Sequence, residues 1–165
     1  MNRETNTFRT FEDLEVYQVA REFRKSMYAV SRKLPAFEKF GLASQIRRAA
    51  VSLTNNIAEG HGRYHFLDQI RFQLPARGSL EELLDDLNVC TDENYLPASE
   101  TDTLKQSAWR VLGLINGYIR YLRSRHGASQ LVLHDQTTSY TTASAPDALA
   151  DEALTPFIPF APPAV

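Results

Sequence analysis

The sequence lacks the features that mark secreted, disulfide-stabilised or membrane-spanning proteins. It contains a single cysteine, Cys90, among 165 residues, so no disulfide can form within one chain. No basic segment followed by an apolar run opens the sequence, and no apolar run approaches the roughly 18 residues of a membrane-spanning helix. We therefore expect a cytoplasmic protein of one domain, long enough to bury a hydrophobic core without disulfides or metals.

Positive charge is also scarce, and its distribution is uneven. All 18 Lys and Arg residues lie in residues 1–125 together with 16 of the 20 Asp and Glu residues, which gives this part a net charge of +2. The last forty residues contain four acidic and no basic residues, so their net charge is −4. A body this weakly basic does not by itself indicate a dedicated nucleic-acid-binding domain.

Apolar residues recur every three or four positions in four segments, the spacing of one helix face. Pro35 ends the first segment because proline cannot donate a backbone hydrogen bond. Gly60 and Gly62 are expected to cap the second segment with positive φ. We place Leu74 on the buried face of the third segment and expect Pro75 to kink it. The spacing predicts helices over residues 13–33, 38–59, 65–91 and 100–124.

No strand pattern separates these helices, which have similar lengths and short connections. They favour an all-α fold, an antiparallel up-and-down four-helix bundle with a disordered C-terminal tail. We assign residues 1–12 to an N-terminal lead-in, 13–124 to the bundle and 125–165 to a tail rich in Ser, Thr, Ala and Pro. The apolar segment 156–163 is either an inert terminus or a short linear motif that docks on a partner.

The fourth helix carries a second apolar face. Leu112 and Ile119 are seven residues apart, and so are Leu114 and Tyr121. A helix that is apolar on two faces is usually buried on both, and in an isolated bundle the second face would be an exposed patch. We therefore predict that this face forms a subunit contact in a homo-oligomer.

No constellation of residues points to catalysis. His61 and His65 lie near Glu59, but Gly62 interrupts the helix that would align the two rings on a metal. Cys90 lies on an apolar face, where a thiol is usually inert. We expect no enzymatic activity, no cofactor or metal, no small-molecule substrate and no association with a membrane.

Polar residues also fall on or beside the predicted buried faces. Asn56 lies two heptads after Leu42 on the apolar stripe of the second helix, and a buried amide must find hydrogen-bond partners. Polar residues in bundle cores can fix the register of the helices. We interpret three residues as a structural polar core: Gln45, Asn56 and Ser79.

The basic residues of the first three helices are the candidates for contacting a partner. Two interpretations remain open. The basic residues complement the acidic run from Glu81 to Glu93 across a subunit interface, or they form a band that binds RNA phosphates, with Tyr64 stacking on a base. The candidate contact residues are Arg24, Lys25, Arg32, Lys33, Arg47, Arg48, Arg63, Tyr64, His65, Arg71 and Arg77.

Several motifs follow one another between residues 8 and 124. They read Phe11-x-x-Leu14-x-Val16-Tyr17-Gln18, Gly41-Leu42-x-x-Gln45-Ile46-Arg47-Arg48-Ala49-Ala50-Val51-Ser52, Asn56-Ile57-Ala58-Glu59-Gly60-x-Gly62-Arg63 and Ala76-Arg77-Gly78-Ser79-Leu80. This series resembles the family of 23S rRNA intervening-sequence proteins, also called four-helix-bundle proteins. The sequence departs from the family pattern in Pro75 and in its weakly basic body.

The resemblance implies an up-and-down bundle that assembles into a ring-like homo-oligomer, a pentamer, without known catalytic activity. It also implies kinship with accessory proteins of diversity-generating retroelements, which bind RNA and a reverse transcriptase through basic surfaces. We therefore expect a non-enzymatic, cytoplasmic, homo-oligomeric adaptor that binds RNA or an RNA-handling protein such as a reverse transcriptase. The alternative is a protein-interaction scaffold that binds no nucleic acid.

Overall fold

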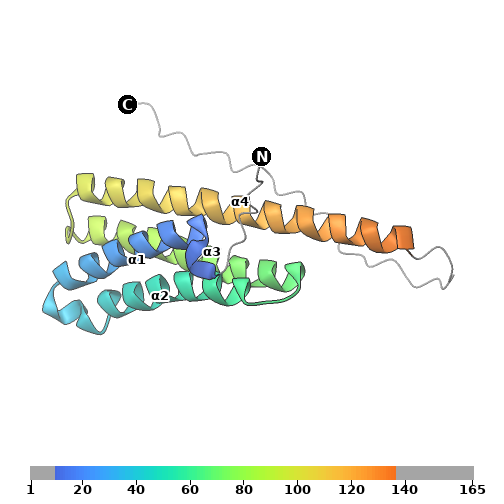
Figure 1. Ribbon diagram of the computed structural model, residues 1–165. Helices are drawn as coiled ribbons and strands as arrows, with labels where there is room; N and C mark the ends of the chain where they lie inside the picture. Colours follow the sequence, from blue (N-terminus) through green and yellow to red (C-terminus); the bar gives the residue numbers. More distant parts are fainter. Residues whose placement is uncertain (1–9, 137–165) are drawn as a thin grey trace, which may run out of the picture.

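The computed structural model describes residues 10–136, and this part of the chain is built from helices without a strand (Figure 1). It confirms the predicted all-α class and the four-helix bundle. Two short 3-10 helices, η1 and η2, precede α1 and α2. The elements are η1 (Phe11–Asp13), α1 (Glu15–Lys33), η2 (Ala36–Lys39), α2 (Leu42–His61), α3 (Phe66–Asp92) and α4 (Ala98–Gln136).

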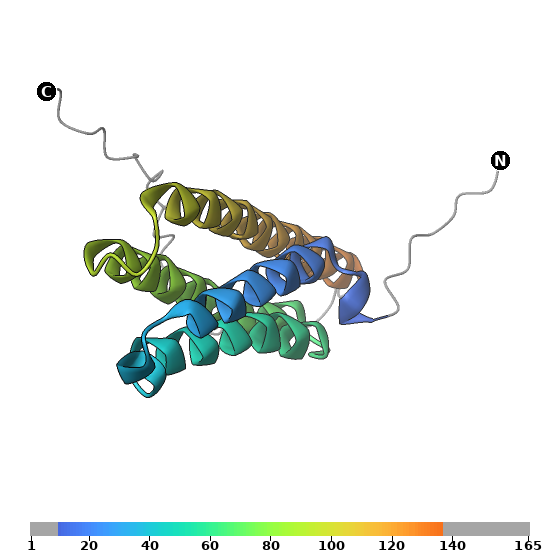
Figure 2. The same ribbon diagram turned by 90° about the vertical axis from the view of Figure 1, so that its left-hand side faces the viewer.

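Consecutive helices run in opposite directions, and α4 also packs against α1 (Figures 1 and 2). Side-chain contacts fix this order. Lys33 at the end of α1 forms an ion pair with Glu100 at the start of α4, with 2.5 Å between nitrogen and oxygen. Thr91 at the end of α3 donates a hydrogen bond of 3.1 Å to Thr101 near the start of α4. The ends of neighbouring helices therefore meet as an up-and-down bundle requires.

The core consists of aliphatic side chains from all four helices. Burying one such side chain contributes roughly 1.5–3 kcal/mol, so the matching stripes hold the bundle together. The largest fully buried side chains are Met27, Val30, Ile46, Leu53, Ile57, Gln73, Leu80, Leu83, Leu87, Val111, Ile115 and Leu122.

The buried face of α3 differs from the predicted one. Leu74 is 52% exposed, whereas Gln73 is fully buried in its place. The inward residues Ile70, Gln73 and Ala76 follow one another at intervals of three, so helical spacing selects Gln73 although Leu74 is the more apolar residue. Pro75 lies on the exposed side, inside the helix.

The two glycines at the end of α2 do not have the predicted role. α2 continues through Gly60 to His61, Gly62 has φ of −72°, and no glycine of residues 10–136 has positive φ. Gly60 is buried, and a Cβ atom there would lie 2.7 Å from Gln73 Nε2 and 3.0 Å from Phe72 Cβ. Gly60 therefore allows α2 and α3 to approach each other closely.

The fourth helix is longer than predicted. It was expected to end at residue 124 and continues to Gln136, beyond the other helices (Figure 1). Gly127 costs only about 0.5–1 kcal/mol within a helix, which helix-forming neighbours can offset. The rest of the predicted tail, including 156–163, and most of the lead-in lie outside the described residues. None of the described helices is long and apolar enough to cross a membrane.

The second apolar face of α4 is divided between two environments. Ile119 is 6% exposed and Leu112 packs against the core, so this pair belongs to the interior of the subunit. Leu114 and Tyr121 instead line a groove between α4 and the start of α1. The predicted face is therefore not one continuous exposed patch.

Candidate functional site

The structure gathers five of the candidate basic residues on the outer side of α1 and α2. Two adjoining hollows of about 560 and 390 Å³ lie there, and both are lined by Tyr28 and Val51. Polar side chains of α2, among them Ser44 and Asn55, line the larger hollow. We call this surface the basic groove and define it by Arg24, Lys25, Arg32, Arg47 and Arg48.

Most of the positive charge of the basic groove has no carboxylate partner. Arg24 donates to Thr54 Oγ1 at 2.8 Å, and Arg47 donates to the backbone oxygen of Lys39 at 3.1 Å. Among the described side chains, those of residues 10–127, neither arginine forms an ion pair, and the same holds for Arg32 and Arg48. Four guanidinium groups are thus held beside a polar surface without a carboxylate in ion-pair contact, although the charge of Arg48 acts on the Asp86 carboxylate.

Lys25 is the exception, because its ammonium group lies 2.6 Å from the Glu22 carboxylate. This contact lowers the pKa of Glu22, mainly through the hydrogen bond that Lys25 donates. Glu59 lies at the other end of the basic groove, where Arg63 pairs with it. Glu22 and Glu59 are each paired with a basic side chain, so they do not neutralise the arginines between them.

The remaining candidate residues lie elsewhere. Lys33 is paired with Glu100 at the end of α1, and Arg71 is paired with Asp68 at 3.1 Å on α3. Arg77 is half-buried on α3. The predicted basic band is therefore divided, and its α1–α2 part lines the two hollows.

A smaller group of candidates surrounds the α2–α3 connection. Arg63 pairs with Glu59 and lies 4.5 Å over the ring of Phe72. Tyr64 is 93% exposed, and its ring meets that of His65 edge to face at 5.1 Å. Because Arg63 has both a carboxylate and an aromatic partner, it is less available for phosphate than the groove arginines.

The predicted polar core is observed in part. Ser79 donates a hydrogen bond of 2.8 Å to Ser52 Oγ, which links α3 to α2. Asn56 donates to the backbone oxygen of Ser52 at 2.9 Å and to its hydroxyl at 3.2 Å. Gln45 is exposed and takes no part in this network, and Asn56, which was expected to be buried, is half-buried. Ser52 and Asn56 also line the basic groove, so the network holds the groove wall in position.

Two buried polar residues of α3 were missed from the sequence. Gln73 has no hydrogen-bond partner within the described residues for either amide atom, and Asp86 has none for Oδ2. The pKa of Asp86 is raised to about 6, first by burial and then by the charges of Glu82 and Asp85, while Arg48 opposes the rise. Asp86 lies three residues after Leu83 and four before Cys90, which is the spacing of the buried helix face. The acidic residues around it suggested an exposed face instead.

Cys90, His61 and His65 are not arranged as a catalytic or metal-binding site. Cys90 is buried, and burial, followed by the charges of Asp86 and Glu38, raises its pKa to about 11, so the thiol is protonated at neutral pH. His61 lines the groove beside α4, and His65 is the N-cap of α3. Among the side chains of residues 10–127, no three His, Cys, Asp or Glu side chains are placed to hold a metal ion together.

The fold and the site thus define a helical bundle with a basic groove on the outer side of α1 and α2. The family model of the 23S rRNA-intervening sequence protein matches residues 12–117. The chain belongs to this family, which confirms the resemblance of the motifs. It is not a known enzyme family. No curated protein matches the chain.

Proposed function

We propose that the protein is a non-enzymatic, cytoplasmic, homo-oligomeric adaptor that binds RNA through the basic groove. The observation that carries this proposal is the set of four guanidinium groups without carboxylate partners around one hollow surface. Guanidinium groups bind phosphate oxygens in pairs, and their attraction to a polyanion adds over successive phosphates. Kinship with proteins of ribosomal RNA insertions is consistent with RNA as the ligand.

The shape of the basic groove favours a polymer over a small anion. Its two hollows join along Tyr28 and Val51, so an extended chain can contact Arg47 and Arg48 in one hollow and Arg32 in the other. Ser44 and Asn55 offer polar groups that suit a ribose hydroxyl or a base edge. Phosphate contacts supply most of the affinity in this arrangement.

Assembly into a ring, a pentamer by resemblance to the family, would repeat the basic groove around the particle. Exposed apolar side chains on α3 and α4 support a subunit interface, since Leu67 is 47%, Leu74 52% and Trp109 55% exposed. Light scattering on the purified protein measures the subunit number. A mass equal to one chain contradicts this part of the proposal.

RNA binding is tested by fluorescence anisotropy with a labelled structured RNA at about 50 mM salt, where phosphate contacts are strong. The double variant Arg47→Ala/Arg48→Ala should bind about tenfold or more weakly, as expected when two charged hydrogen-bonding groups are lost. The variant Arg110→Ala/Arg120→Ala on α4 removes the same charge and should stay near wild type. An equal loss in both variants, or no binding by the wild type, contradicts the proposal.

A protein-interaction scaffold is the second candidate, and one observation favours it. Phe37 within η2 and Phe40 at its end are 75% and 86% exposed, and exposed aromatic side chains of this kind mark surfaces that bind other proteins. An RNA-handling protein such as a reverse transcriptase would then be held directly. Its retention after nuclease treatment, and its loss with Phe37→Ser/Phe40→Ser, would support this alternative against RNA binding.

A further inference from the structure

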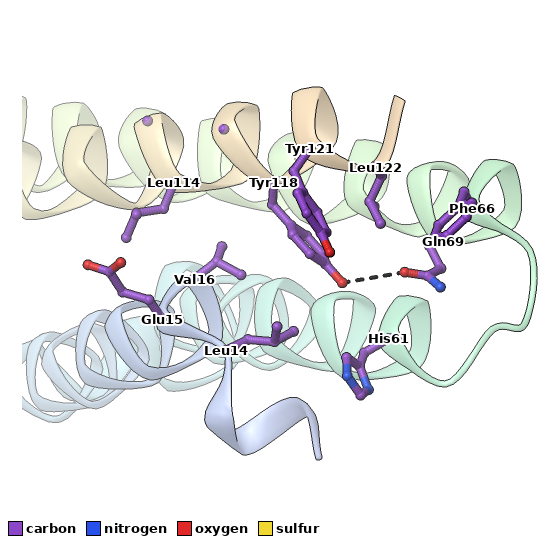
Figure 3. A pocket seen from close by; sticks show the side chains of 12 residues that line it. Leu14, Glu15, Val16, His61, Phe66, Gln69, Leu114, Tyr118, Tyr121 and Leu122 are labelled. Atoms are coloured by element: carbon purple, nitrogen blue, oxygen red, sulfur yellow. Dashed lines mark hydrogen bonds between the residues drawn. The ribbon is translucent and has the colours of Figure 1, made fainter. Parts of the chain in front are cut away.

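A second groove lies between the start of α1 and the middle of α4 and has a different chemistry from the basic groove. Its volume is about 460 Å³ (Figure 3). Leu14, Val16 and Leu122 are buried at its base, and Tyr118 and Tyr121 project into it from α4. We call it the aromatic groove.

The aromatic groove is apolar with a few polar groups at fixed places. The rings of Tyr118 and Tyr121 are stacked, with centroids 6.2 Å apart and planes 13° apart. The hydroxyl of Tyr118 donates a hydrogen bond of 3.4 Å to Gln69 Oε1. Gly113 has open space where a side chain would stand, so the α4 wall is low at that point. Aromatic-lined grooves of this kind bind proline-rich segments in the polyproline II conformation.

We propose that the chain's own segment 156–163, Pro-Phe-Ile-Pro-Phe-Ala-Pro-Pro, binds in the aromatic groove. Its prolines 156, 159 and 162 recur every third position, which matches the three residues per turn of a polyproline II helix. In that conformation Phe157 and Phe160 lie on one side, about 9 Å apart. The segment carries no charged side chain, as an apolar groove requires.

The chain is long enough for this contact. From Leu122 to Gln136 α4 leads about 21 Å away from the aromatic groove at 1.5 Å per residue. Nineteen residues lie between Gln136 and Pro156, and the twenty steps from one to the other span up to about 66 Å when extended, which is enough to return.

Charge favours the same path. The stretch that joins α4 to the segment contains Asp147, Asp151 and Glu152 and no basic residue. On α4, the exposed Arg120 has its guanidinium group beside Gly117 of the aromatic groove. An acidic connection that returns along a basic helix is attracted to it. The docked segment would cover Tyr121, which is 51% exposed.

The test is photo-crosslinking in the full-length protein. Phe160→p-benzoylphenylalanine places the crosslinker in the segment, and mass spectrometry of digested protein locates the attachment site. We expect attachment to residues 113–122 or 14–16. Tyr121→Ser should lower the yield about threefold or more because it removes an aromatic contact. Val89→Ser, at an exposed apolar residue of α3 outside the groove, should leave the yield unchanged.

Circular dichroism of each variant confirms that the helices are intact. Attachment spread over other parts of the bundle overturns the proposal, and so does a yield that Tyr121→Ser does not change. If Tyr121→Ser instead lowers the molar mass in light scattering while crosslinking is unaffected, a second copy occupies the aromatic groove and the proposal is also overturned.

Discussion

Asp86→Asn should stabilise the protein at neutral pH. The side chain of Asp86 is 5% exposed on α3, and its pKa is raised from 3.8 to about 6 by burial, then by Glu82 and Asp85, against the opposing charge of Arg48. A difference of about two pKa units corresponds to about 3 kcal/mol, since each unit is worth about 1.4 kcal/mol. Ionised Asp86 therefore costs the folded state up to about 3 kcal/mol, which the neutral amide avoids.

The sign of the pH dependence follows from proton binding. The folded state holds the proton of Asp86 more tightly than the unfolded state, so the wild type loses stability as the pH rises from about 4 to 6. The advantage of Asp86→Asn should be near zero at pH 4, grow through this window and reach its full size above it.

Urea denaturation followed by circular dichroism measures this effect at pH 4, 5.5 and 7.5, at one protein concentration. Asp92→Asn on the exposed side of the same helix is the control and should change the free energy of unfolding by at most about 0.5 kcal/mol. A gain from Asp86→Asn that is the same at pH 4 and 7.5, or a loss of stability at pH 7.5, would refute the reasoning.

Three further substitutions test the packing. Gln73→Met keeps the length of the side chain and removes two unpartnered amide atoms, so it should raise the free energy of unfolding by about 1–3 kcal/mol; lower stability in urea would contradict this. Ser79→Ala removes the hydrogen bond to Ser52 and should lower the free energy of unfolding by about 0.5–1.5 kcal/mol. An unchanged urea midpoint would contradict this. Lys33→Ala breaks an ion pair whose side chains are 53% and 35% exposed, and should cost less than about 1 kcal/mol; a loss above 2 kcal/mol in the same assay would show that screening by solvent is overestimated.

The sequence allowed the fold to be predicted because each helix shows its period directly. α1 begins within two residues of the predicted start and ends at the predicted residue, where Pro35 prevents its continuation. The α4 error has a different origin. Its amphipathic pattern weakens near Gly127, but a helix continues where its residues favour helix locally.

The candidate site was only partly predictable. The sequence shows that Arg24, Arg32, Arg47 and Arg48 are basic residues of two neighbouring helices, but not which sides of those helices face each other. That depends on the rotation set by side chains such as Tyr28 and Val51. Gln73 and Asp86 have the helical spacing of the inward face of α3. Their polarity argued for exposure, so neither was predicted to be buried.

The salt dependence of RNA binding tests the role of the basic groove most directly. Each phosphate contact contributes a slope of about −0.7 to −0.9 to a plot of log K against log salt concentration. We predict that Arg47→Ala/Arg48→Ala reduces the wild-type slope by about 1.4–1.8, while Arg110→Ala/Arg120→Ala leaves it unchanged. Equal slopes for the wild type and the groove variant would show that RNA does not bind in the basic groove.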